Sequence, residues 1–390
     1  MTASTRAATA VVPRFRWQLA LLVALAFAVP ASLYLAIPIA GRIQDAFRTD
    51  AGTASWTGSA FGLAYAIGFL VCGPLSDRVG RRPILVLGTA ATAVTTALVA
   101  VSPTMDWFIG LRAAQGLAAS SFAPAALAYV AERAPAPRRP VALSLLTTGL
   151  LGAGIVGQLY GQVVAGHTPW QAAFWPVAIC YAAATPLLWL VLARGRPATS
   201  APWRAVYAAI AMLAGRRATA AVFLSASTVF GSFVGMYLVL ESWLRSDHGF
   251  DTGGLLAVEA LGGLGLVVSP VVNRLVGHGS LRRLAVAGYL SAATGLLVEQ
   301  SGVLAAVIAG SVVFVGGISL IVPSLVGLLA ELAPEARGAA VAANTFVLFL
   351  GASLAQLVFV RLSFHVTLGV LTVALVAGAA VVGRLARSRR

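Results

Sequence analysis

Three charged side chains lie within long apolar stretches of this 390-residue sequence: Arg112, Glu241 and Glu259. Arg112 precedes Gln115 by about one helical turn, so these two side chains can share a helix face. A carboxyl group in a partly dehydrated cavity holds a proton and releases it when water enters. These residue types therefore predict a site that binds protons or a polar ligand inside an apolar environment.

A second set of chemically capable residues forms the polar segment 73–83, which reads Gly-Pro-Leu-Ser-Asp-Arg-Val-Gly-Arg-Arg-Pro. Gly73 permits close helix approach and Gly80 permits a tight turn. Asp77 places an acid at the predicted helix end, while Arg78, Arg81 and Arg82 can pair with acids on neighbouring helices. In a simpler interpretation, these arginines only orient the chain in a membrane, but that would explain neither the acid nor the glycines.

Composition indicates which elements must position these residues. The chain is 59% hydrophobic and 10% charged, whereas soluble domains have roughly 45–50% apolar and 25% charged residues. Apolar stretches long enough to span a bilayer run over 17–40, 53–75, 83–102, 107–131, 141–165, 170–193, 218–244, 253–273, 284–300, 303–331, 339–361 and 364–383. The sequence therefore predicts an all-α membrane protein with twelve transmembrane helices. It leaves no room for a soluble ATPase or enzyme domain and has no phosphate-binding loop.

The basic residues follow this twelve-span arrangement. All 27 are arginines, giving a formal net charge of +15, and alternate connections hold 22 of them. Only Arg42, Arg48, Arg245 and Arg361 fall in the other set of connections. Because arginine favours the cytoplasmic side, both termini are predicted to be cytoplasmic, in a bacterial cell membrane. The charge thus reflects topology, and no nucleic-acid partner is expected.

Two halves are predicted from a duplication, since Pro124 and Pro323, and likewise Gly152 and Gly351, recur at the same spacing. Residues 1–193 and 218–390 each form a six-helix half. Residues 194–217 form a cytoplasmic linker whose apolar periodicity fits a short surface helix or a solvated connection. Such repeats place a substrate site near the membrane midplane between the halves.

The segment at 73–83 resembles the signature G-x-L-a-D-R-x-G-R-[RK] of the major facilitator superfamily, and residues 112–116 resemble the R-x-x-Q-G motif of the same family. In the fifth span Gly152, Gly157 and Gly161 resemble the glycine motif of drug/proton antiporters. Gln158 and Gln162 stand where that motif has a proline and a final glycine. Helix packing alone is the alternative role for these glycines.

The resemblance implies the major facilitator fold, with two pseudo-symmetric halves and a conformational gate at the 73–83 segment. Asp77 is then expected to face Gly338 in one conformation, and Arg81 to pair with Glu132. Arg112, Gln115, Glu241 and Glu259 are the candidates for substrate or proton coupling, with Arg112 approaching the glutamates across a central cavity. Glu299 is expected at the membrane interface as a solvated carboxylate.

The predicted function is export of a small amphiphilic organic compound by alternating access, in exchange for protons. The alternatives are an uptake symporter or facilitator for a small organic solute, and a membrane sensor that transports nothing. The expected partners are the substrate, protons and the lipid bilayer, and the expected state is a monomer. No enzymatic activity, cofactor or metal is expected.

Topology is testable with reporter fusions. Because the arginines favour one side of the membrane, fusions after Arg196 and Arg390 should report the cytoplasm. Fusions after Asp50, His167 and Asp247 should report the outside. A cytoplasmic reporter at Asp247 would contradict the arrangement of two six-helix halves.

Overall fold

The structure is a computed structural model that describes residues 3–135, 138–194, 203–268, 271–272 and 281–385. The described residues form twelve helical segments at the positions of the predicted spans, and ten of these lie in helices that are long and apolar enough to span a bilayer unaided. In chain order they are α1 (Ala3–Tyr34), α4 (Trp56–Val79), α5 (Arg81–Ala100), α6 (Met105–Ala119) with α7 (Phe122–Arg133), α8 (Arg139–His167), α9 (Trp175–Val191), α11 (Arg217–Ser246), α12 (Thr252–Gly263) with η3 (Leu264–Val267), α14 (Leu281–Glu299), α15 (Leu304–Leu332), α16 (Arg337–Phe359) and α17 (Phe364–Gly383).

These segments confirm the predicted all-α, twelve-helix fold class. The first span is shorter than predicted, because α1 ends at Tyr34 and the chain turns before the short helix α2 (Ala40–Phe47). Pro38 has no N–H to continue the helix and restricts the residue before it, which explains the early end. The four-residue helix α3 (Ala51–Ala54) follows. Asp50 caps it, and hydrogen bonds from the Thr53 hydroxyl and N–H hold the pKa of Asp50 below its usual range.

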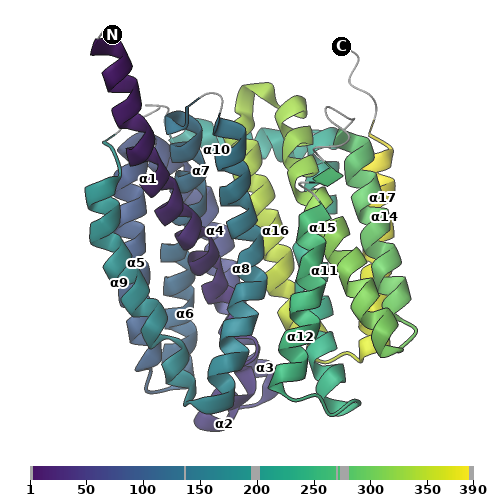
Figure 1. Cartoon of the computed structure of the whole chain (residues 1–390). Coiled ribbons are helices and arrows are strands. Elements are labelled where there is room, and N and C mark those ends of the chain that lie inside the picture. The colour runs from purple at the N-terminus through teal and green to yellow at the C-terminus, as the bar shows by residue number, and fades with distance from the viewer. Residues whose placement is uncertain (1–2, 136–137, 195–202, 269–270, 273–280, 386–390) are drawn as a thin grey trace.

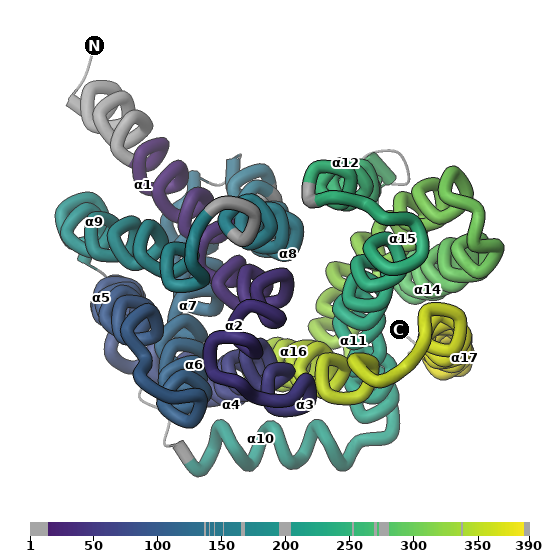
Figure 2. Tube along the Cα trace, turned by 90° about the horizontal axis from the view of Figure 1, so that it is seen from below, coloured from purple at the N-terminus to yellow at the C-terminus, as the bar shows by residue number. Residues whose placement is uncertain are grey.

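The helices form two bundles side by side, one built from α1 to α9 and the other from α11 to α17 (Figure 2). The start of α1 and the end of α17 lie at the same end of the molecule (Figure 1). We call it the basic end, because it carries the α4–α5 turn with Arg78, Arg81 and Arg82. The other end, with α2 and α3, is the opposite end. At the basic end α10 (Trp203–Gly215) lies beside α11 and α16. The first part of the predicted linker, 195–202, lies outside the described residues.

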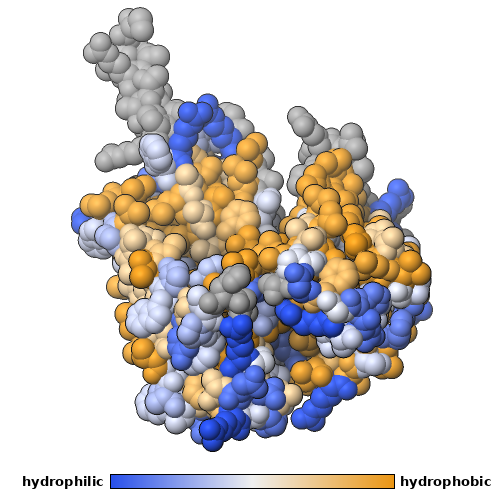
Figure 3. Space-filling view, turned by 60° about the horizontal axis from the view of Figure 1, so that its bottom comes forward, coloured by the Kyte–Doolittle hydropathy of each residue, from blue (hydrophilic) through white to orange (hydrophobic). Residues whose placement is uncertain are grey.

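The flanks of the bundle expose large apolar side chains, among them Leu190, Val373 and Ile179, which are 74%, 70% and 65% exposed. In Figure 3 hydrophobic residues cover the flanks, while hydrophilic residues gather at the opposite end. Soluble proteins rarely show contiguous apolar surface of this extent, whereas the hydrocarbon region of a bilayer requires it. The surface thus fits a protein embedded in a membrane.

Glycines bring α8 into direct backbone contact with α1. A Cβ atom added to Gly157 would lie 2.5 Å from the Ala31 carbonyl oxygen, and one on Gly161 would lie 2.5 Å from the Leu35 carbonyl oxygen. At Gly152 the nearest atom belongs to the movable ring of Phe27, at 2.7 Å. Small residues at these positions allow the close approach of helices that stabilises bundles in lipid.

This packing predicts that Gly157→Ala destabilises the protein by about 1–3 kcal/mol, the usual effect of overpacking a tight contact. The backbone of α1 cannot move aside locally, so the two helices must separate. The measurement is the thermal midpoint of the purified protein in detergent. Gly110→Ala is the matched control, because an added Cβ there meets no atom within 4 Å. Equal midpoints for the two variants would refute the close α1–α8 contact.

Candidate functional site

The turn between α4 and α5 depends on Gly80. Its φ of 100° lies in the region that glycine adopts freely, and its N–H donates to the Ser76 carbonyl oxygen at 3.0 Å. A sharp turn here ends α4 and begins α5 one residue later. Asp77 on the last turn of α4 and Arg81 on the first turn of α5 are therefore brought side by side.

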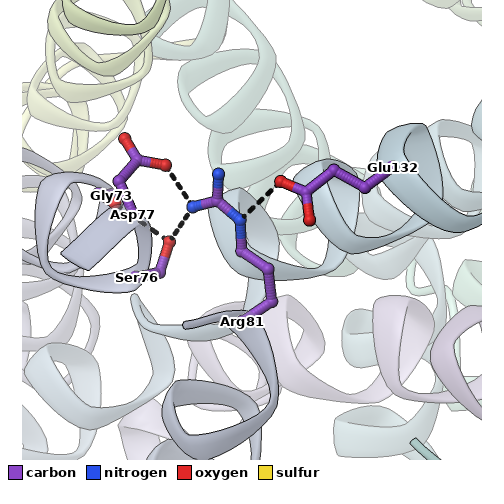
Figure 4. A network of polar contacts seen from close by, with 5 residues as sticks. All are labelled: Gly73, Ser76, Asp77, Arg81 and Glu132. Atoms are coloured by element: carbon purple, nitrogen blue, oxygen red, sulfur yellow. Dashed lines mark hydrogen bonds and ion pairs between the residues drawn. The ribbon is translucent and has the colours of Figure 1, made fainter. Parts of the chain in front are cut away.

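Arg81 is the centre of a polar network at this turn (Figure 4). Its Nη1 forms an ion pair with Asp77 Oδ1 and donates to Ser76 Oγ at 2.7 Å. Its Nε donates to Glu132 Oε1 at 3.1 Å. Ser76 Oγ in turn donates to the Gly73 carbonyl oxygen at 2.9 Å. One guanidinium thus ties α4 and α5 to the basic end of α7.

Arg82 joins the same end of the bundle to α9. Its Nη2 donates to the Trp189 carbonyl oxygen at 2.5 Å, and its guanidinium carbon lies 4.2 Å from the centroid of the Trp189 ring. Arg133 extends these ties by donating to the Arg194 carbonyl oxygen at 2.7 Å. Arg78 lies half-buried on the same turn. Several arginine contacts therefore hold the helices of the N-terminal bundle together at the basic end.

The two bundles meet toward the opposite end of the molecule. Ser59 Oγ donates to the Ser353 carbonyl oxygen at 3.1 Å, joining α4 to α16. Nearer the basic end this pairing stops: a Cβ at Gly73 would meet only Pro124 of its own bundle, and one at Gly338 would meet no described atom within 4 Å. The bundles are thus closed together at the opposite end. Asp77 lies beside Arg81, and α16 presents open space at Gly338.

Aromatic side chains fill the junction between the bundles. The Phe349 ring of α16 lies 4.7 Å from Tyr65 and 5.5 Å from Phe69, both on α4, and 5.2 Å from Phe230 on α11. A second contact joins Tyr34 of α1 to Phe233 of α11 at 6.5 Å. These rings provide large apolar faces where the two halves meet.

Arg112 is fully buried within the N-terminal bundle. Its Nε donates to the Thr57 carbonyl oxygen at 2.8 Å, its Nη2 to the Leu33 carbonyl oxygen at 3.4 Å, and its Nη1 to Gln115 Oε1 at 2.6 Å. Leu33 lies in the last turn of α1, where carbonyl groups lack helical partners and attract cations. In this conformation Arg112 braces α1, α4 and α6, and the structure does not bring it together with Glu241 or Glu259.

Glu259 lies where the two bundles touch. It is 3% exposed, and its Oε1 accepts a hydrogen bond from Gln162 Nε2 of α8 at 2.6 Å. Its other oxygen, Oε2, has no hydrogen-bond partner among the described residues. Glu241 pairs with Arg245 one turn along α11, at 3.2 Å. Of the two predicted glutamates, only Glu259 joins the halves.

The prediction that Glu299 is solvated is wrong. Glu299 has no exposed surface and lies against α15, where Ser311 Oγ is 3.1 Å from its Oε1. Its position at the end of α14 suggested an interfacial location, but the small residues Gly310 and Ser311 let α15 cover it. Sequence position alone did not reveal this packing.

Comparison with known proteins settles the family. The profile described as Major Facilitator Superfamily matches residues 21–356. The chain belongs to the Major Facilitator Superfamily. As a member of it, the protein is a membrane transporter and not an enzyme.

Relatives of this superfamily member include both full-length and partial matches. The MFS-type transporter YceJ of Bacillus subtilis is 24% identical over 83% of this chain and 84% of its own length. The multidrug resistance protein MdtL of Escherichia coli O157:H7 is 30% identical over 35% of each chain. A solved bacterial homolog of the human lysosomal transporter Spinster, in an inward-facing and occupied conformation, shares the fold with a TM-score of 0.74 and 13% identity, covering 95% of this chain and 96% of that one.

Several residues of this site were not singled out from the sequence. Ser76 lies inside the recognised 73–83 segment, but serine at a helix end carries no distinctive signal. The carbonyl groups that hold Arg112 belong to the backbone and leave no trace in residue type. Gln162 was named from the sequence as a departure from the glycine motif, but its contact with Glu259 was not predicted.

The expected approach of Asp77 to the N-terminus of α16 in the other conformation predicts that Asp77→Asn shifts the protein toward the present one, in which Arg81 keeps its bonds to Ser76 and Glu132. The neutral side chain loses its attraction to the N-terminus of α16 in the alternative state. For the measurement, both cysteines are replaced by alanine and spin labels are attached at the basic ends of α4 and α16. The population in which these two helix ends are far apart should rise about tenfold relative to the population in which they are close.

Glu335→Gln is the matched control, because Glu335 also forms an exposed ion pair at the basic end, with Arg216, but within the C-terminal bundle. The control should leave the distance distribution unchanged. An unaltered distribution in Asp77→Asn, with normal expression, would exclude a gating role for Asp77.

Proposed function

We propose that this transporter exports a small amphiphilic organic compound across a bacterial plasma membrane in exchange for protons. The observation that carries the proposal is the buried carboxyl of Glu259 at the contact between the bundles. It binds Gln162 across that contact, and its other oxygen has no hydrogen-bond partner in the part of the chain that the structure describes. A group that gains or loses a proton at this place can bias the equilibrium between the two conformations.

The direction of transport is supported by the named relatives. MdtL is a multidrug resistance protein, and the multidrug efflux pump LfrA of Mycolicibacterium smegmatis is 29% identical over 36% of this chain and 28% of its own length. The aromatic junction supports an amphiphilic cargo, since Tyr65, Phe69 and Phe349 offer apolar faces with one polar hydroxyl.

Orientation follows from the arginines in this proposal. With the basic end in the cytoplasm, the present conformation is inward-open. Residues 1–193 and 218–390 then rock about the aromatic junction, and residues 194–217 connect them on the cytoplasmic side. Opening the opposite end separates Gln162 from Glu259 and admits water, so that Glu259 exchanges its proton with the outside.

The experiment that tests the proposal uses inverted membrane vesicles and the fluorescent dye ethidium. An acidic vesicle interior should drive dye uptake that depends on the transporter. Dye accumulation driven instead by an alkaline interior would favour an uptake symporter, and equilibration that ignores the gradient would indicate a facilitator. A neutral amphiphilic dye separates the effect of pH from that of membrane potential.

Glu259→Gln should abolish the effect of the pH gradient while leaving dye exchange at equal pH measurable. Glutamine preserves shape and hydrogen bonding to Gln162 but cannot bind a titratable proton. With one exchanged proton, a gradient of one pH unit raises the accumulation ratio by at most about tenfold, and the variant should lose that factor.

Glu241→Gln is the matched control. Glu241 lies on the neighbouring helix and pairs with Arg245 instead of with the other bundle, so its loss should change the pH dependence less. If dye transport by Glu259→Gln depends on the pH gradient as in the wild type, proton coupling through Glu259 is refuted.

A further inference from the structure

A second buried carboxyl group, that of Glu299, lies inside the C-terminal bundle. Its Oε1 is 3.1 Å from Ser311 Oγ, and its Oε2 has no hydrogen-bond partner among the described residues. Within the described part of the chain, none of the ion pairs involves it. A buried carboxylate without a counter-charge is strongly disfavoured, so this group is held in its neutral, protonated form.

The hydrogen bonds of Ser311 agree with a protonated Glu299. Ser311 Oγ lies 2.9 Å from the Val307 carbonyl oxygen as well as 3.1 Å from Glu299 Oε1. A serine hydroxyl has one hydrogen to donate. When it donates to Val307, the contact with Glu299 is satisfied by a hydrogen from the carboxyl group.

Tyr237 of α11 has a buried hydroxyl beside α12 and α15. The residue is 2% exposed, and its Oη has no hydrogen-bond partner among the described residues. A Cβ on Gly262 of α12 would lie 2.9 Å from this Oη and 3.4 Å from Ser311 Cβ. The hydroxyl is therefore aimed into the space between α12 and α15. Glu259 lies one turn before Gly262 on the same face of α12.

Gly262, one turn after Glu259, and Ser311, which contacts Glu299, both lie close to the Tyr237 side chain. Polar groups thus follow one another from the contact between the bundles into the core of the C-terminal bundle. In order, they are Gln162, Glu259, Tyr237, Ser311 and Glu299. A buried hydroxyl without a hydrogen-bond partner among the described residues, in the middle of this series, distinguishes it from a chance pair of acids.

We propose that Glu299 is a second proton-binding site, linked to Glu259 through the hydroxyl groups of Tyr237 and Ser311. This inference rests on the proposed proton exchange and extends it to two protons per transport cycle. Glu299 accepts a proton only after it has lost its own. Tyr237 Oη, which has no hydrogen-bond partner among the described residues, first moves into contact with Glu259 and Ser311. Glu259 then gives its proton to the Tyr237 oxygen while Tyr237 releases its own toward Ser311. Ser311 passes its hydroxyl proton to the Glu299 carboxylate. One proton moves, and nothing is oxidised or reduced.

Other titratable groups around this series are few. Glu241 and Arg245 of α11 act electrostatically on Glu259. From α17, His365 contacts Gln300, the neighbour of Glu299, with its Nδ1 3.1 Å from Gln300 Oε1. From α15 only the hydroxyl of Ser311 reaches the Glu299 carboxyl. The pH response of Glu299 must therefore be separated from that of Glu259 and His365.

Infrared spectroscopy tests the site without any substrate. The purified full-length protein in lipid nanodiscs is titrated from about pH 5 to about pH 9, and the stretching band of protonated carboxyl groups is followed. Glu299→Gln should remove one component of this band and Glu259→Gln another. Glu259→Gln should also shift the Glu299 component. Tyr237→Phe should keep both components, and when it is combined with Glu259→Gln the Glu299 component should no longer shift. His365→Gln should leave the Glu299 component in place.

Glu335→Gln serves as the control, because its exposed carboxyl does not contribute to the buried component. If Glu299→Gln does not fold, Glu299→Asp replaces it, because aspartate keeps a carboxyl group. This variant should shift the Glu299 component of the band instead of removing it. A wild-type spectrum without a Glu299 component would overturn the proposal, and so would a component indifferent to Tyr237→Phe.

A transport measurement distinguishes this inference from the proposed function. With two exchanged protons, a gradient of one pH unit raises dye accumulation by up to about a hundredfold, and Glu299→Gln should reduce this to about tenfold. If the infrared component is present but no gradient drives dye movement, proton-driven export fails while the proton site stands. If the gradient drives the wild type and Glu299→Gln equally, the second site fails while export stands.

Discussion

The hydrocarbon core of the membrane has no water to satisfy a polar group, and this constraint governs most of the structure. Each buried donor or acceptor must find its partner within the protein. Arg112 meets the constraint with two backbone carbonyl groups and Gln115. Glu259 meets it only in part, through Gln162. Arg112 therefore stabilises one bundle, whereas the hydrogen bonding of Glu259 depends on how the two bundles meet.

The sequence predicted the fold well because helix number depends on apolar length, and apolar length is visible in one dimension. The α4–α5 turn was predictable for a similar reason: Gly80, Asp77 and Arg81 are close in sequence, so their proximity follows from one turn. The exposure of Glu299 was not predictable, because it depends on α15 covering the end of α14. The contact of Arg112 with Gln115 follows from their spacing, but its other partners were hidden, since they are backbone groups from two other spans.

The two ends of the molecule differ in how they are held. At the basic end, Arg81, Arg82 and Arg133 bind helices within the N-terminal bundle. Toward the opposite end, Ser59, Tyr65 and Gln162 bind across to the C-terminal bundle. Contacts within a bundle persist while the bundles move as bodies, whereas contacts between them must exchange. Polar and aromatic contacts suit the second task, because they can be replaced by water or by a ligand at modest cost.

The arginine contacts at the basic end hold together α4, α5, α7 and α9. The N-terminal bundle can therefore tilt as one rigid body. The 24 residues of α4 form a rod about 36 Å long at 1.5 Å per residue. If the rod pivots near Tyr65, whose ring contacts Phe349 of α16, about 14 residues, or about 21 Å, lie between the pivot and the basic end of α4. A tilt of about 15°, the size of known subunit rotations, then moves that end by about 5 Å. A small rotation at the aromatic junction thereby becomes a larger displacement at the basic end, provided that the arginine contacts keep α4 and its neighbours moving together.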